Sequence, residues 1–154
     1  MSARPGPLRV VIVDDAEELR ILLRLALDRE GDFSVVAEAA DGETGVAAVI
    51  AHQPDLVLLD IAMPVLDGLQ ALPLIRTECP SATVVMLSGF GATSRAAIEA
   101  LQLGAHGYLQ KEGSLTRLAD QLRDLMGTGG PVRAAPRATP RRSQPGPPQG
   151  RLPL

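Results

Sequence analysis

The chain has 154 residues and a formal net charge of −3 at pH 7, so it is long enough for one ordinary domain with a buried core. Its single cysteine, Cys79, excludes an intrachain disulfide and a zinc site built from several cysteines. The N-terminus has no secretory apolar region, and no segment reaches the roughly 20 apolar residues that a membrane span requires. We therefore expect a soluble, cytoplasmic protein without a membrane partner.

Acidic and basic residues are distributed unequally along the chain. All 18 acidic residues precede Gly127, whereas the segment 127–154 holds five arginines and no acid. The same segment is rich in proline and glycine and poor in aliphatic residues, a composition typical of disorder. We predict an ordered domain over residues 8–126, followed by a disordered Pro/Arg/Gly-rich tail over 127–154.

Short apolar runs alternate along the chain with segments of helical periodicity. Strands are predicted at residues 8–13, 33–37, 56–60, 83–87 and 107–110. Helices are predicted at residues 16–30, from Asp41-Gly42 to Pro54, at 69–77, at 93–103, and from a cap at Ser114 to Leu125. This alternation predicts an α/β fold with a doubly wound, five-stranded parallel sheet and five helices on its two faces.

Two features of the predicted helices can be checked against a structure. Apolar residues recur at helical spacing and are expected to face the sheet: Leu19, Leu22, Leu23, Ala26 and Leu27 in the first helix, and Ala97, Ile98 and Leu101 in the fourth. Proline removes a backbone donor, so Pro73 predicts that the third helix is short or bent.

Polar side chains stand where the predicted strands end. Asp14 and Asp15 follow the first strand, Asp60 ends the third, Ser88 follows the fourth and Lys111 follows the fifth. Taken singly, Asp15 is as readily a helix cap, Ser88 an ordinary strand-end residue and Lys111 a solvated cation. The carboxyl ends of parallel strands, however, meet at one edge of the sheet, where open α/β sheets bind their ligands. We therefore expect these residues to converge in one crevice.

The chemistry of this set points to phosphoryl transfer. Crowded carboxylates repel one another unless a cation neutralises them, and oxygen ligands of this kind suit Mg²⁺. With the metal screening the incoming charge, Asp60 is placed to act as the nucleophile. Lys111 is the only lysine among 15 cationic residues, which favours a role that needs a compact ammonium. The hydroxyl of Ser88 is expected to bond a phosphoryl oxygen.

From about Leu8 to Met126 the chain resembles the receiver domain of bacterial two-component response regulators. The resemblance rests on the order of elements and on Asp14-Asp15, Asp60, Met63-Pro64, Asp67-Gly68, Ser88-Gly89, Tyr108 and Lys111. It implies a flavodoxin-like fold with strand order 2-1-3-4-5. It also implies that Asp60 is the phosphoacceptor, that Asp15, Asp60 and the backbone carbonyl of Ile61 bind the metal, and that Asp14 acts on the metal through bound water.

The resemblance further implies a function in signalling. The phosphoryl group would come from a sensor histidine kinase or a phosphotransfer protein, and the output would be a downstream protein target. Such a protein catalyses only its own phosphorylation and dephosphorylation, so we do not expect an enzyme with a separate substrate. Glu112-Gly113 is typical of receivers that precede a helix-turn-helix domain, but only the tail follows Met126, so we expect a single-domain regulator.

An aromatic switch is also implied by the resemblance. Tyr108 is the only tyrosine, and in receivers an aromatic residue at this position moves inward as the hydroxyl of the fourth strand moves to the phosphate. We expect Ser88 and Tyr108 to change a protein-binding face formed by the fourth helix, the fifth strand and the fifth helix. The plain alternative is that Tyr108 is a half-buried ring at the edge of the sheet.

Three other functions were weighed. A flavin-binding domain shares the fold, but Asp14 and Asp15 would repel the flavin phosphate. An acid-nucleophile phosphatase needs a second acid two residues after the nucleophile, where this chain has Ala62. A nucleic-acid-associated regulator, acting through the basic tail or through a lost or separate DNA-binding partner, is the main alternative. Five arginines give salt-dependent attraction to phosphates, but the tail has no aromatic residue to read bases, so specific DNA binding is not expected.

Overall fold

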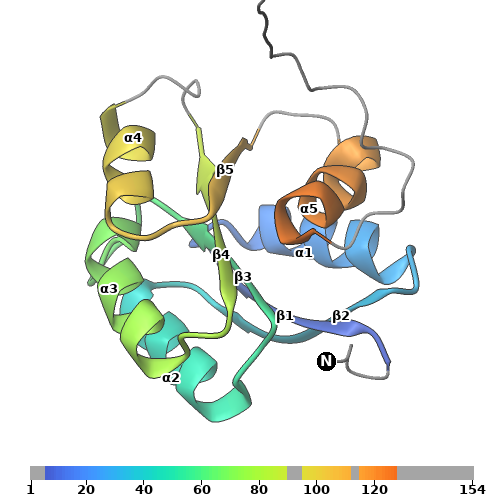
Figure 1. The fold of residues 1–154 in the computed structure, drawn as a ribbon, viewed down its shortest axis with the longest axis horizontal. Coiled ribbons are helices and arrows are strands. Elements are labelled where there is room, and N and C mark those ends of the chain that lie inside the picture. Colours follow the sequence, from blue (N-terminus) through green and yellow to red (C-terminus); the bar gives the residue numbers. More distant parts are fainter. Residues whose placement is uncertain (1–5, 90–94, 112–114, 128–154) are drawn as a thin grey trace, which may run out of the picture. The chain divides into compact units, whose positions relative to one another are not determined.

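The computed structural model describes residues 6–89, 95–111 and 115–127. In these ranges strands and helices alternate as the sequence predicts (Figure 1). The strands are β1 (Leu8–Val13), β2 (Phe33–Ala39), β3 (Leu56–Asp60), β4 (Thr83–Ser88) and β5 (Gly107–Gln110). The helices are α1 (Glu17–Asp28), α2 (Gly42–His52), α3 (Gly68–Glu78), α4 (Arg95–Gln102), the short 3₁₀ helix η1 (Leu115–Arg117) and α5 (Leu118–Met126).

The described residues divide into two compact units, one that ends at Ala119 and one that begins at Asp120. The first unit contains all five strands and the helices α1 to α4. Of the second unit, the structure describes residues 120–127, which continue α5 to Met126 and end at Gly127 with a positive φ of 74°. The predicted cap at Ser114, the predicted start of the fourth helix at residue 93 and the tail beyond Gly127 lie outside the described residues.

The five strands form one parallel sheet in the order β2-β1-β3-β4-β5, which confirms the predicted topology. Consecutive strands are parallel, so the segment between each pair returns the chain to the same end of the sheet, as α2 does between β2 and β3 and α3 does between β3 and β4. As a result, the carboxyl ends of all five strands lie along one edge. The central strand β3 is buried at all of its five residues, as its unbroken apolar sequence predicts.

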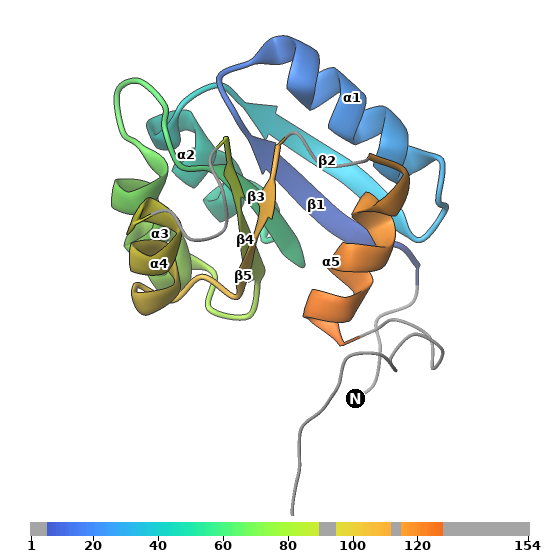
Figure 2. The same ribbon diagram turned by 90° about the horizontal axis from the view of Figure 1, so that it is seen from above.

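Helices cover both faces of the sheet. Helix α1 lies on one face, and α2, α3 and α4 lie on the other (Figure 2). The pleat of the strands divides their side chains between these layers. One face contributes Val11, Val13, Val57, Leu59, Val84 and Met86 to a core with Val49, Ala71, Leu72, Ile75 and Ala100 of the helices. Burial of an aliphatic side chain contributes about 1.5–3 kcal/mol, so this layer carries much of the stability of the unit.

The predicted apolar stripes of the helices are only partly buried. In α1, Leu23 and Leu27 are buried, but Leu22 is 49% exposed. In α4, Ala97 is buried, whereas Ile98 and Leu101 are 48% and 41% exposed. A helix lying on a sheet covers it with a narrow strip of residues, so apolar side chains at the edge of the stripe face solvent.

Pro73 does not shorten the third helix, and the alternative that it bends this helix stays a prediction. Helix α3 runs for 11 residues with Pro73 inside it. Pro73 is exposed, so water can bond the carbonyl oxygen that proline leaves without its usual donor. Two strands are also longer than predicted, because β2 extends to Ala39 and β4 includes Ser88.

In the part of the chain that the structure describes, no helix combines the length and apolar character needed to cross a bilayer.

Candidate functional site

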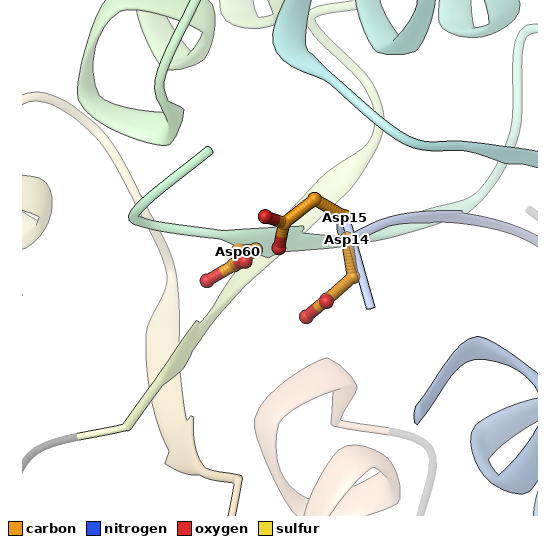
Figure 3. Close-up of side chains that lie close together, drawn as sticks. All are labelled: Asp14, Asp15 and Asp60. Atoms are coloured by element: carbon orange, nitrogen blue, oxygen red, sulfur yellow. The ribbon is translucent and has the colours of Figure 1, made fainter. Parts of the chain in front are cut away.

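Three carboxyl groups meet at the carboxyl edge of the sheet. Asp14 and Asp15 follow β1 and Asp60 ends β3, and each has a carboxylate oxygen within 4.8 Å of the others (Figure 3). Asp14 and Asp60 are buried, at 0% and 2% exposure, while Asp15 is exposed. The structure therefore brings the predicted acidic residues together, with one carboxylate open to solvent and two beneath it.

Lys111 completes this cluster from the end of β5. Its ammonium nitrogen lies 3.0 Å from Asp60 Oδ1 and 3.1 Å from Asp14 Oδ2. The backbone N–H of Lys111 donates to the carbonyl of Ser88 over 2.8 Å, which fixes the start of the side chain at the end of β4. One cation thus bridges two buried carboxylates, which would otherwise repel each other.

The electrostatics of the site reflect this burial. Burial raises the pKa of Asp60 from its ordinary 3.8 to about 6; the hydrogen bond from Lys111 opposes this rise, and the charge of Asp14 adds to it. Burial by itself lowers the pKa of Lys111, but the attraction of the Asp60 and Asp14 carboxylates outweighs it, so the net shift is upward. Lys111 is therefore a stable ammonium, and Asp60 is a carboxylate that needs positive charge nearby to remain ionised.

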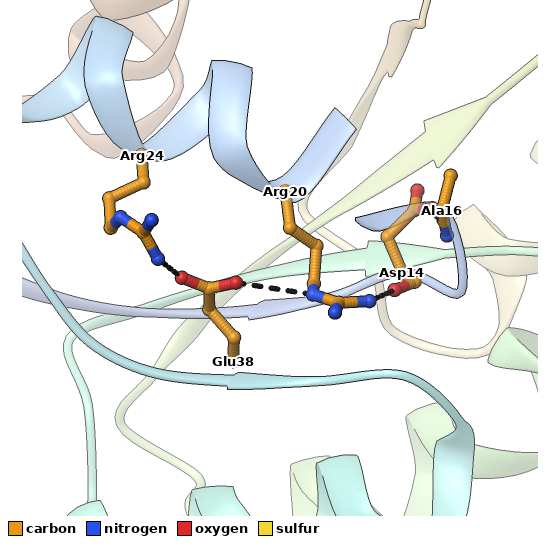
Figure 4. Close-up of polar contacts among 5 residues, drawn as sticks. All are labelled: Asp14, Ala16, Arg20, Arg24 and Glu38. Carbon is orange, nitrogen blue, oxygen red and sulfur yellow. Dashed lines mark hydrogen bonds and ion pairs between the residues drawn. The ribbon is translucent and has the colours of Figure 1, made fainter. Parts of the chain in front are cut away.

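The backbone of Asp14 and one of its carboxylate oxygens are held by hydrogen bonds. Its N–H donates to Ala39 O over 3.0 Å, and its carbonyl accepts a bond of 2.6 Å from Arg20 Nη1 (Figure 4). Its Oδ1 accepts from the N–H of Ala16 over 2.8 Å, and its Oδ2 faces Lys111. The residue that precedes α1 is Ala16, which has no side-chain cap, so the alternative reading of Asp15 as a helix cap is wrong.

A tight backbone contact fixes the other side of the site. The N–H of Gly68, the first residue of α3, donates to Ile61 O over 2.8 Å. A Cβ added at Gly68 would lie 2.1 Å from the carbonyl oxygen of Asp60, so only glycine fits this approach. A capping box between Asp67 and Gln70 starts the same helix. The loop after Asp60 is thus packed directly on the N-terminus of α3.

The remaining predicted site residues occupy the expected elements. Ser88 is the last residue of β4 and is 2% exposed. Tyr108 lies in β5, partly buried against the core, as the plain alternative for this ring predicts. The carbonyl of Ile61 accepts the bond from Gly68, but a carbonyl oxygen has a second lone pair, so its role as a metal ligand stays a prediction.

The cluster fits a hard divalent cation. Among the described residues, two buried carboxylate oxygens, Asp14 Oδ2 and Asp60 Oδ2, lack a hydrogen-bond partner, although Asp14 Oδ2 is ion-paired with Lys111. A buried carboxylate oxygen without a donor is costly, and a bound cation would satisfy it. The donor set consists of carboxylate oxygens with one exposed member, which suits Mg²⁺ because this ion retains several waters.

Four supporting residues were not predicted to act at the site. Arg20 of α1 donates a hydrogen bond to the carbonyl of Asp14, and Glu38 of β2 binds the same arginine. Gly42 and Gly68 each approach the loop after β3 so closely that a Cβ would lie 2.0 Å from Leu66 O or 2.1 Å from Asp60 O. The Asp-Gly pairs that start α2 and α3 can be seen in the sequence, but the close contacts of their glycines with the loop after β3 cannot.

Comparison with known proteins identifies the family. The family model of the response regulator receiver domain matches residues 10–123. Over 143 residues the chain is 36% identical to the protein-glutamate methylesterase/protein-glutamine glutaminase 2 of Nitratidesulfovibrio vulgaris. That match includes 84% of this chain but 39% of the relative, so the chain spans well under half the length of that protein.

Solved structures agree with this assignment. The signal receiver domain of the response regulator NarL from Mycobacterium tuberculosis is similar with a TM-score of 0.74 and 33% identity, over 80% of this chain and 98% of that one. The CheX-CheY-BeF3-Mg²⁺ complex from Borrelia burgdorferi contains a chain with a TM-score of 0.72 and 30% identity, over 78% of this chain and 90% of that one. This protein belongs to the response regulator receiver family of two-component signalling.

Proposed function

We propose that this protein is a phosphoacceptor response regulator that receives a phosphoryl group on Asp60. The observation that carries the proposal is the position of Lys111, whose ammonium bridges Asp60 and Asp14 at 3.0 and 3.1 Å. A buried nucleophilic carboxylate, a cation beside it and two further carboxylates for a metal are the parts that phosphoryl transfer to an acid requires.

The residues support the following reaction. A carboxylate oxygen of Asp60 forms a bond to phosphorus while the bond between phosphorus and the donor, a histidine nitrogen or a small acyl phosphate, breaks. The product is an acyl phosphate on Asp60, and the leaving group takes the electron pair of the broken bond. The ammonium of Lys111 lies 3.0 Å from Asp60, so it can exchange this carboxylate oxygen for an oxygen of the phosphoryl group. The negative charge that the phosphoryl group adds is then paired with the ammonium.

Asp14, Asp15 and Asp60 would hold Mg²⁺, which supplies positive charge for the incoming phosphoryl oxygens. In this proposal the exposed carboxylate of Asp15 would bind the ion directly, and the buried Asp14 would act through a bound water. The match to the receiver family and the similarity to a chain of the CheX-CheY-BeF3-Mg²⁺ complex support this proposal. The donor is proposed to be a histidine kinase or a phosphotransfer protein, and the output a protein partner.

The output is proposed to pass through β4 and β5. Ser88 ends β4 beside Asp60, and Leu87 of β4 pairs with both Asp60 and Leu109 in the sheet. Tyr108 pairs with Met86, one residue before the pair of Leu87 and Leu109. If Ser88 moves to bond a phosphoryl oxygen, we propose that the partly buried Tyr108, which packs against the core that includes Ala100 of α4, repacks in response.

Labelling with a small phosphodonor tests the proposal. The protein is incubated with acetyl phosphate, with and without Mg²⁺, and its intact mass is measured for the wild type, Asp60→Asn and the control Asp67→Asn. We expect the wild type and the control to gain one phosphoryl group only with Mg²⁺, and Asp60→Asn to gain none. Equal labelling of Asp60→Asn and wild type would show that Asp60 is not the acceptor.

A further inference from the structure

The acidic pair after β1 is linked to the neighbouring strand β2 by a hydrogen bond from Arg20 and by an ion pair between Arg20 and Glu38. Arg20 of α1 donates from Nη1 to the carbonyl of Asp14 over 2.6 Å, and from Nε to Glu38 Oε1 over 3.1 Å. The second carboxylate oxygen of Glu38 accepts from Arg24, one helical turn further along α1 (Figure 4). Arg20 and Glu38 are largely buried, with 15% and 21% of their side chains exposed, whereas Arg24 is 40% exposed.

The atom that Arg20 binds matters for the site. The carbonyl oxygen of Asp14 belongs to the peptide group that joins Asp14 to Asp15. Because this group is planar, fixing the direction of the oxygen also fixes the direction in which the chain enters Asp15. A flexible arginine side chain would not hold that direction by itself, but Glu38 binds its Nε and so sets where Nη1 points.

We propose that Arg20, oriented by Glu38, is a positioning residue that fixes the Asp14–Asp15 peptide and thereby the affinity of the acidic cluster for Mg²⁺. The inference rests on the proposed function and deepens it. Outer residues that orient metal ligands commonly change metal affinity without touching the ion. The carboxylates that would bind the ion are those of Asp14, Asp15 and Asp60, so Arg20 and Glu38 would act on the ion only through them.

Charge and position predict opposite results for Arg20→Gln and the same result for Glu38→Gln. Arg20→Gln removes a cation near the acidic cluster, so by charge alone it would strengthen Mg²⁺ binding. Glu38→Gln removes an anion, so by charge alone it would weaken Mg²⁺ binding. If the pair acts by positioning, both substitutions weaken binding. The double variant should then lose no more affinity than the larger single effect, because one bonded unit is broken in each case.

The test measures Mg²⁺ binding to the full chain by isothermal titration calorimetry. We expect Arg20→Gln and Glu38→Gln each to weaken binding by roughly tenfold, the lower end for residues that orient metal ligands. The matched control is Arg24→Gln. Arg24 lies on the same helix, carries the same charge and also binds Glu38, but it does not touch Asp14. We expect its affinity to lie within about twofold of wild type, as for an exposed ion pair.

A second readout needs no metal. In the metal-free protein we expect the amide hydrogens of Asp14 and Ala16 to exchange faster in Arg20→Gln and Glu38→Gln, because the hydrogen bonds of these N–H groups depend on the position of the same loop. We expect exchange at the wild-type rate in Arg24→Gln. If Arg20→Gln does not fold, the near-isosteric Glu38→Gln carries the exchange test against the same control. Tighter Mg²⁺ binding by Arg20→Gln, or unchanged affinity and exchange in both variants, would overturn the inference. A wild type that binds no Mg²⁺ would instead overturn the proposed function.

Discussion

The ammonium of Lys111 lies 3.0 Å from a carboxylate oxygen of Asp60, although Lys111 follows β5 and Asp60 ends β3, two strands that are not neighbours in the sheet. Strand β4 separates β3 from β5, so the Lys111 side chain must cross the end of β4 to reach Asp60. Its backbone N–H bonds to Ser88 at that end. The cation is therefore fixed at its base by one strand and at its tip by another.

The first prediction concerns the shape of this cation. Lys111→Ala should slow phosphorylation of Asp60 by acetyl phosphate by on the order of 10²-fold, as for loss of one electrostatic group in an active site. Lys111→Arg should restore only part of the rate, because a planar guanidinium does not fit where a compact ammonium bridges two carboxylates. Rates are followed by intact mass, with Arg29→Ala as the control. Wild-type rates in Lys111→Arg would show that only charge matters.

The second prediction concerns pH and stability of the metal-free protein. A carboxyl whose pKa is raised in the folded state binds protons more tightly there than in the unfolded chain, so stability falls as pH rises from about 4 to 6. The difference between 3.8 and about 6 corresponds to at most about 3 kcal/mol of destabilisation at neutral pH.

Asp60→Asn removes the group that titrates. Its free energy of unfolding in urea should therefore exceed that of wild type at pH 7.5, and the advantage should shrink as the pH falls to 4. Asp67→Asn, which keeps a good helix cap, serves as the control. An Asp60→Asn variant that is less stable than wild type at pH 7.5 would show that the bond between Asp60 and Lys111 outweighs the cost of burial.

The third prediction concerns Gly68. A Cβ at this position would lie 2.1 Å from Asp60 O and 2.8 Å from Ile61 Cα, and both are backbone atoms that cannot rotate away. Gly68→Ala should therefore destabilise the fold by about 1–3 kcal/mol and slow phosphorylation, because the strand end that carries Asp60 must shift. The control is Gly89→Ala, whose Cβ would meet nothing within 4 Å. Thermal melts and labelling rates equal to wild type in Gly68→Ala would contradict this role.

The fourth prediction concerns the output. On addition of beryllofluoride and Mg²⁺, the NMR signals of the Tyr108 ring and of the amides of Ser88 and Lys111 should shift together. The shifts should be absent in Asp60→Asn. The free energy that couples phosphorylation to binding of a partner should be about 1–3 kcal/mol, the usual scale for such switches. Changes confined to the neighbours of Asp60 would leave the phosphorylation chemistry intact and remove the switch.

The fold and the convergence of the polar residues could be predicted from the sequence because both follow from strand ends. The apolar run before Asp60 marks a buried central strand, and in a parallel sheet every such strand ends at the same edge. The supporting contacts could not be predicted. Arg20 reads as a surface residue of an amphipathic helix, and only the fold shows that Glu38 lies within reach of it. The exposure of Leu22 could not be predicted either. Periodicity shows which side of a helix is apolar, but it does not show how wide a strip of that side the sheet covers.

The measurement that tests the central claim most directly is the location of the phosphoryl group. Wild-type protein is treated with acetyl phosphate and Mg²⁺, digested rapidly at low pH with pepsin, and its peptides are sequenced by tandem mass spectrometry. The account predicts one phosphoryl group, on Asp60, in a peptide from the end of β3. A phosphoryl group on another residue, or none on a protein that binds Mg²⁺, would contradict it.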